Sequence, residues 1–245
     1  MYHSEIASIS DGHNFAQYIA DKAPLFYRDP RKVAADLLEG GYFLSTVRAT
    51  LAKIPTSASF QQSHFAEIAS AVFAEEVLGL VRLYSKLSML TAENANAYKM
   101  DLLLCDPSPE PVEFIFAEVK SSVKSQTPAK HDAGCFADLF TSMKKYESGD
   151  LDFDLTAARD RLDELTPDLK PRVMRALLPY SGARVRFAAF VVIDSRTRNE
   201  SETRVLGSRK SVKDFDVDLM CVESLSDVAS QSYKILEQIR DACSK

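Results

Sequence analysis

The fold of this chain is decided by two segments, Lys99-Met100-Asp101-Leu102-Leu103-Leu104 and Phe114-Ile115-Phe116-Ala117-Glu118-Val119-Lys120. Each has the composition of a short apolar β-strand. Three charged side chains, those of Asp101, Glu118 and Lys120, stand inside these strands. Because an unpaired charge near a core costs several kcal/mol, we expect the fold to bring the three together. A divalent metal ion held by the two carboxylates, with the lysine beside it, would account for their presence.

The connection between the two segments predicts a β-hairpin. Residues 106–111, Asp-Pro-Ser-Pro-Glu-Pro, are typical of a turn or loop. The second segment alternates in character, as expected of a strand with two different faces. One face carries Phe114, Phe116, Glu118 and Lys120, and the other carries Ile115, Ala117 and Val119. We therefore expect antiparallel pairing through the loop.

Helical and strand patterns alternate along the rest of the chain. Apolar spacing predicts a long helix over 63–81, with Phe65, Ile68 and Val72 on its core side. Further helices are predicted after Asp29-Pro30 and over 43–54, 136–143, 155–165, 173–178 and 224–242, and further strands over 184–193 and 217–222. Strands embedded among helices, with long crossover connections, favour an α/β sandwich-like architecture.

The composition is that of a globular protein. At 245 residues the chain suits one large domain, or a core with an added subdomain. Apolar residues make up 46%, which is enough for a substantial core. No apolar run approaches ~18 residues and no signal-peptide pattern opens the chain, so we expect a cytoplasmic protein without a membrane span. The four cysteines are scattered, as expected of reduced thiols.

The charge of the chain is unevenly distributed. A net charge of −5 argues against a protein that coats nucleic acid unaided. Residues 170–213 nevertheless hold 11 lysines and arginines against 3 acidic residues. Such a segment suits a surface that faces phosphate groups, and it equally suits a solvated face of loops and helices.

The order of a glutamate-bearing helix, a strand with aspartate and a strand with Glu-x-Lys resembles the PD-(D/E)xK nuclease superfamily. The matching residues are Asp101 for the first acid, and Glu118 and Lys120 for the Glu-x-Lys pair. Met100 stands where the proline of the superfamily is expected. The resemblance implies an α/β, restriction-endonuclease-like core of helix, β-meander, helix and strand. It also implies a metal-dependent phosphodiesterase, specifically a deoxyribonuclease.

Phosphodiester cleavage would explain these residue types. Mg²⁺ prefers hard oxygen ligands, and Asp101 and Glu118 on adjacent strands would supply two, with the Val119 carbonyl as a third. Mn²⁺ accepts the same set of oxygen atoms. Lys120 projects from the same face as Glu118. There its ammonium would orient or help to deprotonate the attacking water and would offset charge on the phosphate.

A glutamate on the helix before the strands completes the expected site. Glu67 resembles the helix glutamate of the superfamily, which helps to hold a metal ion or its water. The resemblance thus implies Glu67, Asp101 and Glu118 as metal ligands. Glu75 lies roughly 80° further round the helix and remains the alternative. His64, one turn before Glu67, is expected to be a polar neighbour, because the four histidines lack metal-binding spacing.

A narrower resemblance covers about residues 60–240. The HamA family, the nuclease subunit of Hachiman anti-phage defence, is similar in three short segments: His64-Phe65-Ala66-Glu67, Lys99-Met100-Asp101 and Glu118-Val119-Lys120-Ser121-Ser122. We therefore expect a nuclease-like domain over 59–245, with an N-terminal helical region, 1–58, packed on it. The resemblance also implies DNA cleavage that is restrained until a superfamily-2 helicase partner, HamB, senses abnormal DNA. This chain has no phosphate-binding Gly-rich motif, so nucleotide-driven work falls to a partner.

Two other functions fit the same residues. One is a non-catalytic subunit on a degenerate nuclease fold, which binds DNA or the helicase and in which the acids pair with Lys120 and nearby arginines. The other is a stand-alone restriction- or junction-type nuclease of the same superfamily. DNA and RNA both remain open as substrates, and so do the activating signal and the oligomeric state.

Overall fold

The computed structural model describes residues 4–28, 34, 38, 43–90, 100–124, 135–144, 146, 151–159, 161–178, 182–198 and 215–244. Its elements, with η marking a 3₁₀ helix, are β1 (Ser4–Ile9), α1 (Gly12–Lys22), α2 (Pro24–Tyr27), α4 (Phe43–Leu51), α5 (Ala58–Glu76), β2 (Val81–Ser85), η1 (Lys86–Met89), β3 (Leu102–Asp106), β4 (Glu113–Ser122), α6 (Cys135–Met143), α7 (Asp152–Arg159), η4 (Leu162–Glu164), α8 (Leu169–Ala176), β5 (Arg184–Asp194), η5 (Ser195–Thr197), β6 (Asp216–Val222) and α10 (Leu225–Ser244). Of the helices described, none combines the length and the apolar character that a membrane crossing requires.

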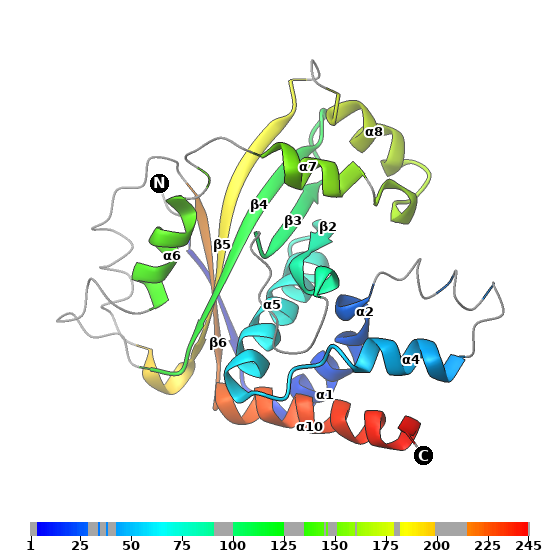
Figure 1. Ribbon diagram of the computed structural model, residues 1–245. Coiled ribbons are helices and arrows are strands. Elements are labelled where there is room, and N and C mark those ends of the chain that lie inside the picture. Colours follow the sequence, from blue (N-terminus) through cyan, green and yellow to red (C-terminus); the bar gives the residue numbers. More distant parts are fainter. Residues whose placement is uncertain are drawn as a thin grey trace.

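Six strands form one mixed sheet in the order β1-β6-β5-β4-β3-β2 (Figure 1). β2, β3 and β4 are antiparallel neighbours, whereas β4, β5, β6 and β1 run parallel. The proline-containing loop joins β3 to β4, with Leu102 opposite Ala117 and Cys105 opposite Phe114, so the predicted hairpin is confirmed. Helix α5, the meander β2–β4, helix α6 and strand β5 follow in the expected α/β order.

Helices cover both faces of the sheet (Figure 1). On one face α1, α4, α5 and α10 enclose an apolar core that includes Ala117, Val119 and Phe190. On the other face α6, α7 and α8 enclose a second core that includes Phe114 and Phe116. Because side chains alternate along a strand, residues 118 and 120 of β4 project toward the α6–α8 side, together with these phenylalanines, as the sequence predicts.

Helix α5 lies in the middle of its layer, where it contacts β4 on one side and α1 and α10 on the other. Residues 64–72 are all buried, which is the pattern of a helix enclosed on every side. Small side chains such as Ala66, Ala69 and Ala71 allow the neighbouring elements to approach closely. This central position is why Glu67, a charged residue, is only 2% exposed.

The helix predicted over 63–81 is wrong at its C-terminal end. α5 ends at Glu76, and Gly79 adopts a left-handed backbone conformation with a φ of 68°, which glycine tolerates without a steric cost. The chain then enters β2, where Val81 pairs with Cys105 of β3. Val81 continues the helical spacing of apolar residues, and for that reason the spacing concealed the strand.

The N-terminal region contributes a strand that the sequence did not predict. β1 pairs in parallel with β6, with Ser4 opposite Val217 and Ile9 opposite Val222. The first 58 residues therefore supply an edge of the sheet as well as the helices α1, α2 and α4. The helix predicted after Asp29-Pro30 lies outside the described residues, apart from positions 34 and 38.

Helix α1 approaches α10 closely at Gly12. A Cβ atom added there would lie 2.7 Å from Cγ2 of Val228. We expect Gly12→Ala to lower the free energy of unfolding by about 1–3 kcal/mol, the usual cost of overpacking, as measured by urea denaturation. Val228→Ala removes the opposing methyl groups, so the double variant should be more stable than the two single losses predict together. If the double variant loses as much free energy of unfolding as the two single variants together, that result would contradict this close approach.

Candidate active site

Asp101 lies directly before β3, at the point where β3 and β4 begin to pair. The first paired residues are Leu102 and Ala117. Beyond this pair the Val119 N–H donates to Oδ2 of Asp101 at 2.7 Å, so the carboxylate continues the pairing that the backbone of β3 no longer provides. The carbonyl of a strand residue lies on the same side as its N–H. The Val119 carbonyl therefore also lies on the Asp101 side of β4.

A lysine absent from the sequence predictions lies against Asp101. Lys86 opens η1 directly after β2, and its backbone N–H donates to the Asp101 carbonyl at 3.0 Å. Its Nζ forms ion pairs with Oδ1 of Asp101 and with Oε1 of Glu67, the latter at 3.0 Å. Glu67 and Asp101 thus share one ammonium group, which connects α5 to the start of β3.

Glu118 and Lys120 form the third ion pair of the cluster. Lys120 Nζ donates to Oε1 of Glu118 at 2.9 Å. Asp101 connects Lys86 to this part of β4, because one of its oxygens contacts Lys86 and the other accepts from the backbone N–H of Val119. The structure therefore brings all four predicted residues, Glu67, Asp101, Glu118 and Lys120, to one end of the β3–β4 hairpin.

The alternative helix glutamate does not join this cluster. Glu75 pairs with Nε of Arg82 at 3.3 Å and is about one-third exposed. Of the two glutamates that the sequence left open, Glu67 is the one in contact with Lys86.

The carboxylates of the cluster are buried, and the ammonium groups are partly exposed. Glu67, Asp101 and Glu118 side chains are 3%, 4% and 5% exposed, against 20% for Lys86 and 26% for Lys120. Among the described residues, three carboxylates against two ammonium groups give the cluster one net negative charge when all are ionised. In addition, Oε2 of Glu67 is buried and has no hydrogen-bond partner among the described residues. A proton on Glu67, or a further cation, would offset the negative charge and would give Oε2 of Glu67 a partner.

The pKa values of the cluster follow from burial and charge. Burial, together with the carboxylates of Asp101 and Glu118, raises the pKa of Glu67 to about 8 even though Lys86 opposes the shift. For Lys86 burial acts to lower the pKa, but the carboxylates of Glu67 and Asp101 raise it above its ordinary value. At Lys120 burial also acts to lower the pKa, but the carboxylate of Glu118 outweighs it and the pKa is raised. Both lysines are therefore charged at neutral pH, so Lys120 suits charge stabilisation better than proton removal.

His64 belongs to a separate group of buried hydrogen bonds. Its Nδ1 lies 3.0 Å from the Tyr27 hydroxyl, which lies 2.8 Å from the Tyr233 hydroxyl. Burial, and the positive charge of Lys86 nearby, lower the pKa of His64 to about 3. The neutral ring links α5 to α2 and α10, which fits the expected role of a polar neighbour.

In chemistry and charge, the cluster fits a divalent cation. Asp101 and Glu118 supply hard oxygen atoms, and the Val119 carbonyl lies on the Asp101 side of β4. Within the described part of the chain, however, no three histidine, cysteine, aspartate or glutamate side chains lie close enough to hold one ion together. Glu67 contacts Asp101 through the Lys86 ammonium. The best-fitting ligand set is therefore Asp101 and Glu118 with the Val119 carbonyl and water.

The basic segment over 170–213 is largely neutralised where the structure describes it. Five of its cations pair with acidic side chains, which favours a structural role for them over a phosphate-facing surface. These pairs are Lys170 with Asp163, Arg172 and Arg175 with Glu110, Arg186 with Glu113 and Asp216, and Arg196 with Asp194. Residues 199–213 lie outside the described residues, as does Lys99.

The raised pKa of Glu67 predicts a pH-dependent stability. Because the folded chain holds this proton more tightly than the unfolded chain, the resulting stabilisation is full below about pH 4.5 and is lost as the pH rises to about 8. Relative to Glu67→Gln, which cannot ionise, the wild type should lose at most about 1.4 kcal/mol per pH unit across this window. Urea denaturation of both proteins at several pH values measures the difference. If the free energy of unfolding of the wild type, relative to that of Glu67→Gln, stays constant or rises with pH, that result would contradict the raised pKa of Glu67.

Comparison with known proteins identifies the family. A search of curated proteins gave no match. A sequence model of the HamA family matches residues 3–236 of the 245, a range that contains all five residues of the charged cluster. The chain therefore belongs to the HamA family of the Hachiman antiviral defence system.

Proposed function

We propose that this chain is the metal-dependent nuclease subunit of a Hachiman complex, which cuts or nicks DNA under the control of a partner helicase. The observation that carries this proposal is that Asp101 accepts a hydrogen bond from the Val119 N–H, between the ion-paired residues Glu118 and Lys120. The order of helix, meander, helix and strand around them supports a PD-(D/E)xK placement. HamA family membership supports the defence context.

Each charged side chain has a distinct role in this proposal. A Mg²⁺ or Mn²⁺ ion held by Asp101 and Glu118 would supply a Lewis acid and a water of lowered pKa. Lys120, charged and partly exposed beside Glu118, stabilises negative charge that develops on the phosphate. Lys86 fixes the orientation of Asp101 through one oxygen, while Val119 fixes it through the other. Glu67 holds Lys86 and thereby helps to keep Asp101 in place beside the ion.

In this proposal a partner protein delivers the DNA substrate. The chain is acidic, with a net charge of −5, and the cations described between residues 170 and 198 are mostly paired with acids. Neither feature suits strong binding to DNA without help. A HamB-like superfamily-2 helicase would bring abnormal DNA to the site and would license cleavage there.

A non-catalytic subunit is the second candidate, and one observation favours it. Asp101, Glu118, Lys86 and Lys120 all find partners within the chain, so the cluster is a self-contained set of ion pairs. In that case the same face would bind DNA or the helicase without cutting. A stand-alone restriction- or junction-type nuclease is the remaining alternative, and activity on naked DNA without any partner would identify it.

Substitution of the strand acids tests the proposal. Asp101→Asn and Glu118→Gln preserve side-chain shape but remove the charge, so we expect each to reduce metal-dependent cleavage at least about a hundredfold. The assay follows plasmid DNA, linear DNA and RNA with and without Mg²⁺, for the chain alone and with its co-purified helicase. Circular dichroism establishes that the variants fold.

Glu113→Gln is the matched control, because Glu113 lies on the same strand but pairs with Arg186 away from the cluster. It should cleave like the wild type. Cleavage that requires the helicase supports a gated nuclease, whereas cleavage by the chain alone supports the stand-alone alternative. An absence of cleavage in every combination, or full activity of the Asn and Gln variants, would contradict the proposed nuclease.

A further inference from the structure

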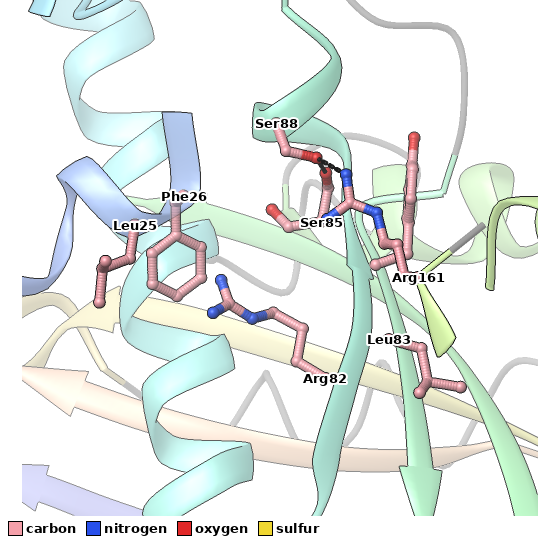
Figure 2. A pocket seen from close by; sticks show the side chains of 8 residues that line it. Leu25, Phe26, Arg82, Leu83, Ser85, Ser88 and Arg161 are labelled. Atoms are coloured by element: carbon pink, nitrogen blue, oxygen red, sulfur yellow. Dashed lines mark hydrogen bonds between the residues drawn. The ribbon is translucent and has the colours of Figure 1, made fainter. Parts of the chain in front are cut away.

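A second polar site lies next to the charged cluster, in a pocket between α2 and the β2–η1 segment. The pocket is partly enclosed and has a volume of about 40 Å³. Two arginines, Arg82 and Arg161, and two serines, Ser85 and Ser88, supply its polar lining (Figure 2). Among the described residues that line it, none is acidic. Ser85 directly precedes Lys86 in the chain, so the β2–η1 segment contributes to both the pocket and the candidate active site.

The two guanidinium groups are held in place by neighbouring side chains. The guanidinium carbon of Arg82 lies 3.8 Å from the centre of the Phe26 ring, and its Nε pairs with Glu75. Arg161 donates from Nη2 to Oγ of Ser88 at 2.8 Å, and that hydroxyl donates to the Ser85 carbonyl at 2.7 Å. In Figure 2 Arg82 reaches toward Phe26, whereas Arg161 approaches Ser88 and Ser85. Preorganised cations of this kind lose little freedom when they bind a ligand.

Ser85 provides a separate observation that points to a ligand. Its side chain lines the pocket, the residue is only 3% exposed, and its Oγ has no hydrogen-bond partner among the described residues. A buried hydroxyl without a partner costs free energy, so a ligand that accepts its hydrogen bond would recover that cost.

We propose that this pocket binds a phosphoryl group, with Arg82, Arg161 and Ser85 as its ligands. Arginine and hydroxyl donors around a small space suit an anion with several oxygens, and the guanidinium fork matches phosphate geometry. A water molecule needs about 10–15 Å³ of such space, so the pocket has room for a larger group. The phosphoryl group belongs either to the backbone of a nucleic acid or to a free phosphate or nucleotide. Only the backbone source rests on the proposed nuclease function.

Phosphate-dependent stabilisation tests the site without any cleavage. Melting temperatures are measured in EDTA, with potassium phosphate or with potassium chloride at equal ionic strength. Wild type should be stabilised by phosphate beyond the effect of chloride. Ser85→Ala and Arg161→Gln should each weaken phosphate binding about tenfold, as expected from the loss of one hydrogen bond to a charged group. Because Ser85 Oγ has no hydrogen-bond partner in the described part of the chain, Ser85→Ala should not lower the melting temperature in chloride.

Arg175→Gln serves as the control, since Arg175 is 68% exposed and lies outside the pocket, where it pairs with Glu110. It should respond to phosphate like the wild type. Anisotropy of a labelled DNA duplex, again in EDTA, distinguishes the sources: weaker duplex binding by Ser85→Ala indicates a backbone phosphate, and unchanged duplex binding indicates a free phosphate or nucleotide. Equal stabilisation by phosphate and chloride, or undiminished phosphate binding by both pocket variants, would overturn the assignment.

Discussion

The two hydrogen-bonded oxygens of Asp101 hold the candidate site together. One oxygen accepts from the backbone of β4 at Val119, and the other contacts Lys86, which in turn contacts Glu67 on α5. This carboxylate therefore connects a buried helix, the η1 turn and the strand that carries Glu118 and Lys120. It does so directly before the first paired residues of β3 and β4, Leu102 and Ala117.

The cluster is an expensive arrangement for stability alone. Burying ions costs several kcal/mol each, and apolar side chains of similar volume are often as stabilising as a buried ion pair. Here three carboxylates that are no more than 5% exposed share two ammonium groups, and the pKa of Glu67 is raised to about 8 as a result. Strongly perturbed acids beside lysines are typical of catalytic centres. The proposed nuclease function would explain why the chain contains this destabilising cluster, because a bound cation would balance its charge.

The sequence predicted the parts of the site that lie on regular strands. Alternation along 114–120 placed Glu118 and Lys120 together, and the proline loop predicted the hairpin that brings Asp101 beside them. Lys86 was missed because its contact with Glu67 and Asp101 arises from tertiary folding and has no periodic signal. The sequence analysis assigned the charge of the acids to a divalent metal ion, and no pattern in the sequence indicated a second lysine. β1 and β2 were missed for local reasons: β1 is short and rich in small polar residues, and Val81 continues the helical spacing of α5.

Direct measurement of metal binding tests the central claim, that Asp101 and Glu118 form a site for a divalent cation. Isothermal titration of Mn²⁺ into the wild type, Asp101→Asn, Glu118→Gln and Glu75→Gln separates the strand acids from a helix glutamate that pairs elsewhere. We expect the wild type and Glu75→Gln to bind Mn²⁺, and the two strand variants to bind it about tenfold or more weakly. Equal affinity in all four proteins, or no binding by the wild type, would contradict this claim.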